Sequence, residues 1–183
     1  MSRLGIYASQ ISGHLTPSTG FVSIATFTPT SGTSITFNSI PQVYKHLQLR
    51  MLVMQSGTAS DVCIKLNSNV GVGSHYIQGR NTTASAGRNL QDATNGTLMD
   101  NYNSNTASIG WAAVTDLLDY TNTNKYKVWR NLQGYEQNTT NSAVGLVSGL
   151  HEITAAVTTI TITLAGGASF TTGTSIALYG IQG

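Results

Sequence analysis

Apolar and polar side chains alternate with a period of two residues along much of this chain. In residues 45–55 (KHLQLRMLVMQ) one side of the chain carries Leu47, Leu49, Met51 and Val53. In residues 157–164 (VTTITITL) one side carries Ile160, Ile162 and Leu164, with threonines on the other. A period of two is typical of half-buried β-strands, because successive side chains in a strand point to opposite faces.

The stretch before residue 45 adds a second strand and a corner. Residues 33–37 (TSITF) alternate in the same way, and the run stops at Asn38-Ser39-Ile40-Pro41. Proline lacks the backbone N–H that a β-ladder needs and restricts the residue before it. We therefore predict two strands that flank a short corner at Pro41.

The whole chain follows the same pattern and predicts an all-β fold. We expect strands near residues 21–28, 33–37, 45–55, 61–67, 75–80, 109–120, 125–136, 143–153, 157–164 and 175–181. Residues 81–108 are polar and weakly patterned, and we predict that they form a long connection with an edge strand near Leu98. About eight to ten strands separated by turns favour an antiparallel jelly-roll sandwich. We predict one such domain over residues 21–183.

Residues 1–20 lack a regular pattern and are predicted to form an extended N-terminal arm. They contain no long apolar core of the kind found in signal peptides. No stretch of the chain approaches the ~20 apolar residues of a membrane-spanning helix, so we expect no membrane partner. We predict that the arm docks outside its own sandwich, on another subunit or on a capsid, through Leu4, Ile6 and Tyr7, with Arg3 as a polar anchor.

Charged residues form only 9% of the chain, against about 25% in a typical globular protein. The chain has 26 Thr, 19 Ser, 14 Asn and 19 Gly, a bias that favours strands and turns. Its net charge is +2, and its nine Lys and Arg residues form no run. Nucleic-acid binding through a basic patch is therefore not expected.

The sequence predicts no catalytic, cofactor or metal site. The nearest pair of carboxylates for glycoside hydrolysis is Asp116 and Asp119, and strand parity places them on opposite faces. The four histidines lack metal-binding spacings such as HExxH. The single cysteine, Cys63, alternates toward the polar side of its strand, and we interpret it as a small packing residue.

Five aromatic residues invite two interpretations. They are Trp111, Trp129, Tyr102, Tyr126 and Tyr135. They could form a platform on which a sugar stacks, or they could pack in the core and across strands. Tyr126 and Trp129 differ in strand parity, so one face of a strand does not hold both, and core packing is the preferred interpretation.

Three motifs give the chain a resemblance to a known group of proteins. They are SIPQVYKHLQLR (39–50), LLDYTNTNKYKVWR (117–130) and ALYGI (177–181). In this order, over residues 36 to 183, they resemble a family of small virion structural proteins of tailed phages of aquatic bacteria, such as cyanophages. The resemblance implies a jelly-roll fold, a homotrimer and a place on the capsid surface or in a tail fibre. It implies no catalytic residue.

Three functions follow as expectations. The first is a capsid decoration (cement) protein that clamps neighbouring major capsid protein subunits on the outside of the virion. The second is the tip domain of a tail fibre, with a host-surface glycan as its ligand. The third is a virion depolymerase, which the shortage of carboxylates disfavours. The low charge suits a subunit whose surface is shared with neighbours, since such interfaces depend on shape and local polar contacts.

Overall fold

The computed structural model describes residues 20–56, 61–70, 73–80, 83–89, 96–99, 110–135 and 142–183. The four residues predicted to anchor the arm, Arg3, Leu4, Ile6 and Tyr7, lie outside the described residues. The first described strand begins at Phe21. All regular structure in the described residues is β-strand, with no helix.

Each of the ten predicted strands is present. They are β1 (Phe21–Phe27), β2 (Ser34–Phe37), β3 (His46–Val53), β5 (Val62–Leu66), β7 (Gly73–Arg80), β10 (Trp111–Leu118), β11 (Lys127–Tyr135), β12 (Ala143–His151), β13 (Ile160–Leu164) and β15 (Ser175–Ile181). Pro41 lies between β2 and β3, so the stretch divides into two strands around a corner as predicted. Five further strands complete the described set: β4 (Gln55–Ser56), β6 (Asn69–Val70), β8 (Thr83–Asn89), β9 (Gly96–Met99) and β14 (Ser169–Phe170).

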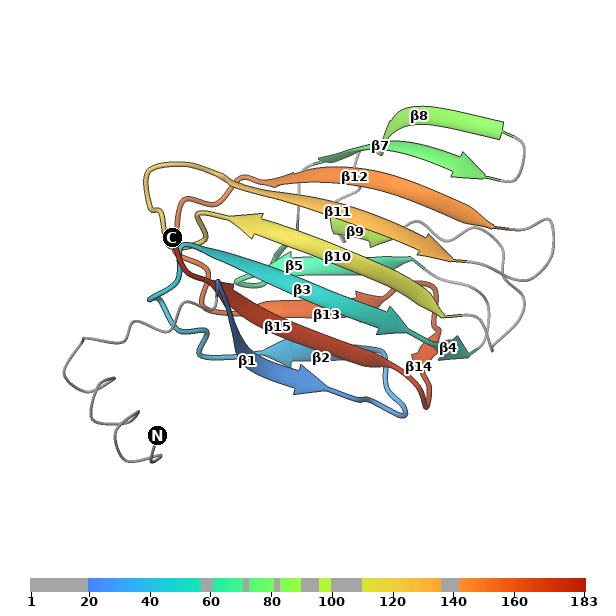
Figure 1. The fold of residues 1–183 in the computed structure, drawn as a ribbon, viewed down its shortest axis with the longest axis horizontal. Helices are drawn as coiled ribbons and strands as arrows, with labels where there is room; N and C mark the ends of the chain where they lie inside the picture. Colours follow the sequence, from blue (N-terminus) through green and yellow to red (C-terminus); the bar gives the residue numbers. More distant parts are fainter. Residues whose placement is uncertain are drawn as a thin grey trace, which may run out of the picture.

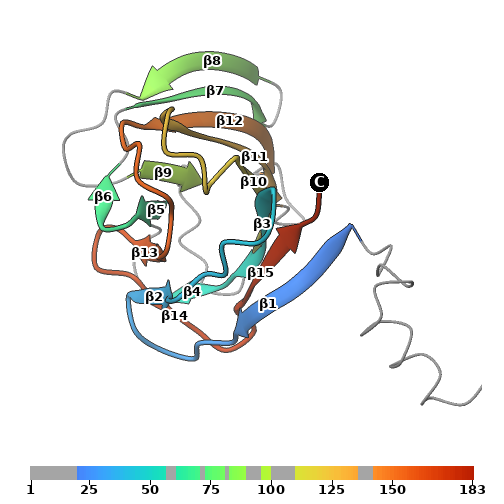
Figure 2. The same cartoon turned by 90° about the vertical axis from the view of Figure 1, so that its left-hand side faces the viewer.

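The strands form two main antiparallel sheets. The larger has eight strands in the order β1-β15-β3-β10-β11-β12-β7-β8, and the smaller has the order β2-β13-β5-β6, with β9 paired to β5. Figure 2 shows the large sheet curving around the small one, and Figure 1 shows the strands of both sheets along their length. An antiparallel β-sandwich is thereby confirmed. Its jelly-roll winding stays a prediction, since β10, β11 and β12 follow one another as a simple meander.

The core lies between the two sheets and is built from the predicted alternation. Leu47, Leu49, Met51 and Val53 of β3 are all buried, as are Ile160, Ile162 and Leu164 of β13. A T-shaped contact between the rings of Phe27 and Phe37, with centroids 4.9 Å apart, joins β1 to β2. Burial of each large aliphatic side chain contributes roughly 1.5–3 kcal/mol, so the core needs no disulfide.

Two predictions about the middle of the chain need correction. Cys63 does not lie on a solvated side of its strand, because β5 is buried on both faces and Cys63 is buried with it. The connection over residues 81–108 holds more regular structure than expected. Leu98 falls in β9 as predicted, but β8, composed of small and polar residues, adds an edge strand to the large sheet.

Candidate functional site

The outer face of the large sheet, which points away from the small sheet, carries several exposed aliphatic side chains. Strand registers align its outward residues in rows that run across the strands. One row joins Val114, Leu132, Leu146, Ile77 and Ala86, taken from five neighbouring strands. We call these five residues the apolar row. The next row joins Gln48, Asp116, Arg130, Ser148 and His75, and we call it the polar row.

The apolar row is exposed in the single chain. Val114 is 39% exposed, and Leu132, Leu146 and Ile77 are 53%, 56% and 64% exposed. Val144, which lies on the same outward face of β12, is 63% exposed. Scattered apolar residues are normal on protein surfaces, but a contiguous patch marks an interaction surface.

The polarity of this part of the sheet is inverted. An antiparallel sheet with one solvated face normally directs apolar residues inward and polar residues outward. Strand β11 instead directs Asn131 and Gln133 inward, where both are buried, and Leu132 outward. The Thr115 hydroxyl donates to Oδ1 of Asn131 at 2.8 Å, so the inward polar groups are hydrogen-bonded. Strand β7 repeats the inversion, with Gln78 buried and Ile77 exposed.

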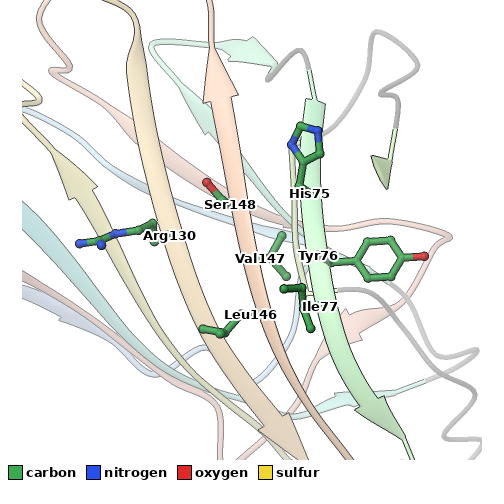
Figure 3. A pocket seen from close by; sticks show the side chains of 7 residues that line it. All are labelled: His75, Tyr76, Ile77, Arg130, Leu146, Val147 and Ser148. Carbon is green, nitrogen blue, oxygen red and sulfur yellow. The ribbon is translucent and has the colours of Figure 1, made fainter. Parts of the chain in front are cut away.

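A hollow of about 400 Å³ lies where the two rows cross β11, β12 and β7. Figure 3 shows Leu146 beside Ile77 and Ser148 near His75, with the Arg130 side chain extending away from β12. The hollow thus joins an apolar part from the apolar row to a polar part from the polar row. Its shape and composition suit a protein side chain or a short segment from another molecule.

The other end of the outer face is held by a chain of polar contacts. The guanidinium of Arg50 lies over the rings of Phe21 and Tyr179, 5.0 Å and 4.9 Å from their centroids. Nε of Arg50 donates to Oε1 of Gln48 at 2.8 Å, and Nε2 of Gln48 donates to Oδ1 of Asp116 at 2.8 Å. Strands β1, β15, β3 and β10 are therefore fixed relative to one another on the outside.

The three sequence motifs of the phage-protein resemblance meet at one end of the sandwich. The Tyr120 hydroxyl of the second motif donates to the carbonyl of Pro41 in the first. The first motif reaches the third where the N–H of Lys45 donates to the carbonyl of Ile181 at 2.8 Å. The ring of Tyr44 lies so close to Gly180 that a Cβ on that glycine would be 2.2 Å from it. The motifs therefore hold this end of the fold together.

Asp119 is the charged centre of this junction. Lys125 donates a hydrogen bond to its carboxylate, and Nζ of Lys45 lies 3.5 Å from Oδ1. The hydrogen bond from Lys125 holds the pKa of Asp119 below its usual value; partial burial opposes this, and the charges of Lys125 and Lys45 add to the lowering. Nδ1 of His46 accepts the backbone N–H of Asp119 at 2.9 Å, so this nitrogen acts as an acceptor. Asp119 has a φ of 46°, which fits its place in a tight turn.

Lys127 is fully buried next to the same turn. Its ammonium donates to the carbonyls of Asn122, Lys125 and Thr154, the latter two at 3.1 Å and 3.0 Å. Burial lowers the pKa of Lys127, and the Lys125 charge adds to this. The three carbonyl contacts tie the β10–β11 turn to the segment after β12, which is a structural role.

The sequence-predicted chemical residues do not converge. Asp116 lies within β10, whereas Asp119 lies beyond its end and belongs to the lysine cluster. In the described residues no group of three or more His, Cys, Asp or Glu side chains could hold a metal ion. The described residues contain no helix that could span a membrane.

The aromatic residues proposed for a sugar platform are mostly in the core. Trp111, Trp129 and Tyr135 are buried, and Tyr126 is 49% exposed. Tyr102 lies outside the described residues. The rings of Trp111 and Tyr135 pack on each other at 4.2 Å. Three of the five rings therefore serve packing and have no face free for a sugar.

Sequence reasoning missed the outer face as a candidate site. Alternation identifies which residues share a face, but it does not say which face points to the core. The sequence did contain an indication of this surface, because the side chains that point outward from β11 and β12 are as apolar as those that point inward from many other strands. Comparison with protein-family models, with curated proteins and with solved structures found no match.

Proposed function

We propose that this protein is a structural subunit of a tailed-phage virion, and that it works as a homotrimeric decoration protein on the outer surface of the capsid. The observation that carries a structural role is the exposed apolar row on an inverted sheet. Such a surface is unfavourable in water and favourable when another protein covers it. The phage assignment rests on the three sequence motifs and their resemblance to virion proteins.

A structural role also fits the chemistry of the described residues. The strongest charge cluster, around Asp119, is arranged as ion pairs that hold a turn. The buried polar groups Thr115 and Asn131 bond to each other. These groups satisfy one another, and none of them faces a substrate-sized cleft with a second carboxylate, as glycoside hydrolysis would require.

A tail-fibre tip that binds glycan is the alternative function. The hollow beside Arg130, His75 and Ser148 favours it, because these side chains offer hydrogen bonds beside an apolar surface. The buried aromatic residues disfavour it, since sugar-binding sites commonly use an exposed ring. The decoration role is therefore preferred.

Electron cryomicroscopy of intact purified virions, with the subunit identified by its density, tests this function. A decoration protein occupies symmetry-related positions over the whole icosahedral shell. Density restricted to the tail would replace the decoration role with the fibre role. Absence of the protein from purified particles would overturn both.

A further inference from the structure

The outer face of the large sheet is broad enough for a contact between subunits. Five strands (β10, β11, β12, β7 and β8) at a spacing of about 4.8 Å, each about eight residues long at about 3.3 Å per residue, cover about 600 Å². In the proposed homotrimer each face is shared between two neighbours, so three faces bury about 1,800 Å² in total, which is about 600 Å² at each of the three contacts. The total lies within the range for specific protein–protein interfaces, while a single contact lies below it. The face is therefore large enough for a closed trimer whose three contacts form together.

The chemistry of the face favours a second copy of this chain. The apolar row consists only of aliphatic side chains, and the hollow of about 400 Å³ beside it has room for an aliphatic side chain from another copy. In the polar row, Asp116 and Arg130 are cross-strand neighbours, yet Asp116 bonds to Gln48. Every ion pair within the described residues involves Asp119, so Arg130 has no carboxylate partner there. A second copy that docks through the same face supplies an apolar row to cover this one and an Asp116 carboxylate as a partner for Arg130.

We infer that the apolar row faces the symmetry axis of the homotrimer, where it packs against the same sheet of the neighbouring copies. This inference rests on the proposed homotrimer and specifies its interface. Around a threefold axis, the large sheet of each copy contacts the other two. The small sheet and the motif junction at Asp119 then lie away from the axis.

Two variants test the inference, Leu132→Asp and Leu146→Asp, with Val43→Asp as the matched control. Leu132 and Leu146 are exposed on the face, and Val43 is 79% exposed in the connection between β2 and β3, off the face. Light scattering coupled to size-exclusion chromatography measures the mass of each protein, and circular dichroism checks the fold. We expect the wild type and Val43→Asp to be trimers. Each leucine variant should have one third of the wild-type mass, with an unchanged β-sheet spectrum.

Crosslinking gives a second readout that does not depend on disrupting the trimer. Leu146→Cys, treated with a short bis-maleimide reagent, should give a covalently linked pair on a denaturing gel, while the wild type, whose Cys63 is buried, should not. Leucine variants that stay trimeric, together with an uncrosslinked Leu146→Cys trimer, would overturn this interface and leave the homotrimer intact. A monomeric wild type would overturn the homotrimer itself, and the interface with it.

Discussion

Leu132 on β11 lies directly opposite Leu146 on β12, and both leucines point out of the sandwich with more than half of their surface exposed. Cross-strand pairs of this kind normally stabilise a sheet when other residues cover them. Here the described chain supplies no cover. The residues beneath them include Asn131 and Gln133, which are buried and polar. The pair therefore gives the outer face of the sheet an apolar character that is more usual for a buried face.

The junction of the three motifs should depend on the Tyr120 hydroxyl. Tyr120 is fully buried, and its hydroxyl donates to the carbonyl of Pro41. Tyr120→Phe leaves that carbonyl without its donor, so we expect a loss of about 1–3 kcal/mol in the free energy of unfolding, measured by urea denaturation. Tyr126→Phe is the matched control, because Tyr126 is half-exposed and its change should fall within about 0.5 kcal/mol. Equal effects of the two substitutions would argue against the junction.

Replacement of Gly149 by alanine should destabilise the protein, because the Trp129 ring occupies the space that the new Cβ would need. A Cβ on Gly149 would lie 2.0 Å from Cζ2 of the Trp129 ring, which is packed in the core. Gly149→Ala should therefore destabilise the protein by about 1–3 kcal/mol or more, because the ring must move. Gly79→Ala is a control within a strand, since a Cβ there meets nothing within 4 Å. Thermal melts that show no difference between the two variants would contradict the described packing.

His151 should make stability depend on pH. Its Nδ1 accepts the indole N–H of Trp129 at 3.3 Å, and burial lowers its pKa from 6.5 to about 4. Below pH 6.5 the unfolded chain binds a proton that the folded chain does not bind until about pH 4. Stability is therefore lost as the pH falls through this window, by up to about 3 kcal/mol in total.

The measurement for His151 is a difference between two proteins. Urea denaturation from pH 7 to pH 4 of the wild type and of His151→Gln separates this histidine from the other titrating groups. The wild type should lose more stability over that range than the variant. The lowered pKa of Asp119 acts at lower pH, because its contribution to stability is lost as the pH falls through the ordinary value of 3.8, where the unfolded carboxylate binds a proton before the folded one does. Parallel curves for the two proteins would show that His151 is not held neutral by burial.

Much of the fold follows from the sequence, and the reason is the regular period of two. All ten predicted strands are present, and the alternation of aliphatic with polar residues is clearest in β3 and β13. Strand β8 was missed because its residues, TASAGRN, carry no apolar alternation and are ordered by pairing with β7. Cys63 is buried, as expected of a packing residue, but its place on the polar side of β5 was wrong, since a strand inside a sheet can be covered on both faces.

The candidate site was less predictable than the fold. In KVWRNLQGY, alternation separates Val128, Arg130 and Leu132 from the residues between them, but both sets mix polar and apolar residues. Only the sheet order shows that Asn131 lies inside and Leu132 outside. Likewise, nothing in the sequence spacing brings Pro41, Tyr120 and Gly180 together, because residues far apart in the chain meet only through the tertiary fold.

The mass of the wild-type protein in solution tests the central claim most directly. Sedimentation equilibrium at micromolar concentration, in about 0.1 M and about 1 M NaCl, measures it without any substitution. An interface made mainly by the apolar row should be insensitive to salt, because screening weakens exposed charge pairs and not apolar contacts. We predict a homotrimer at both salt concentrations. A monomer at both would contradict the account.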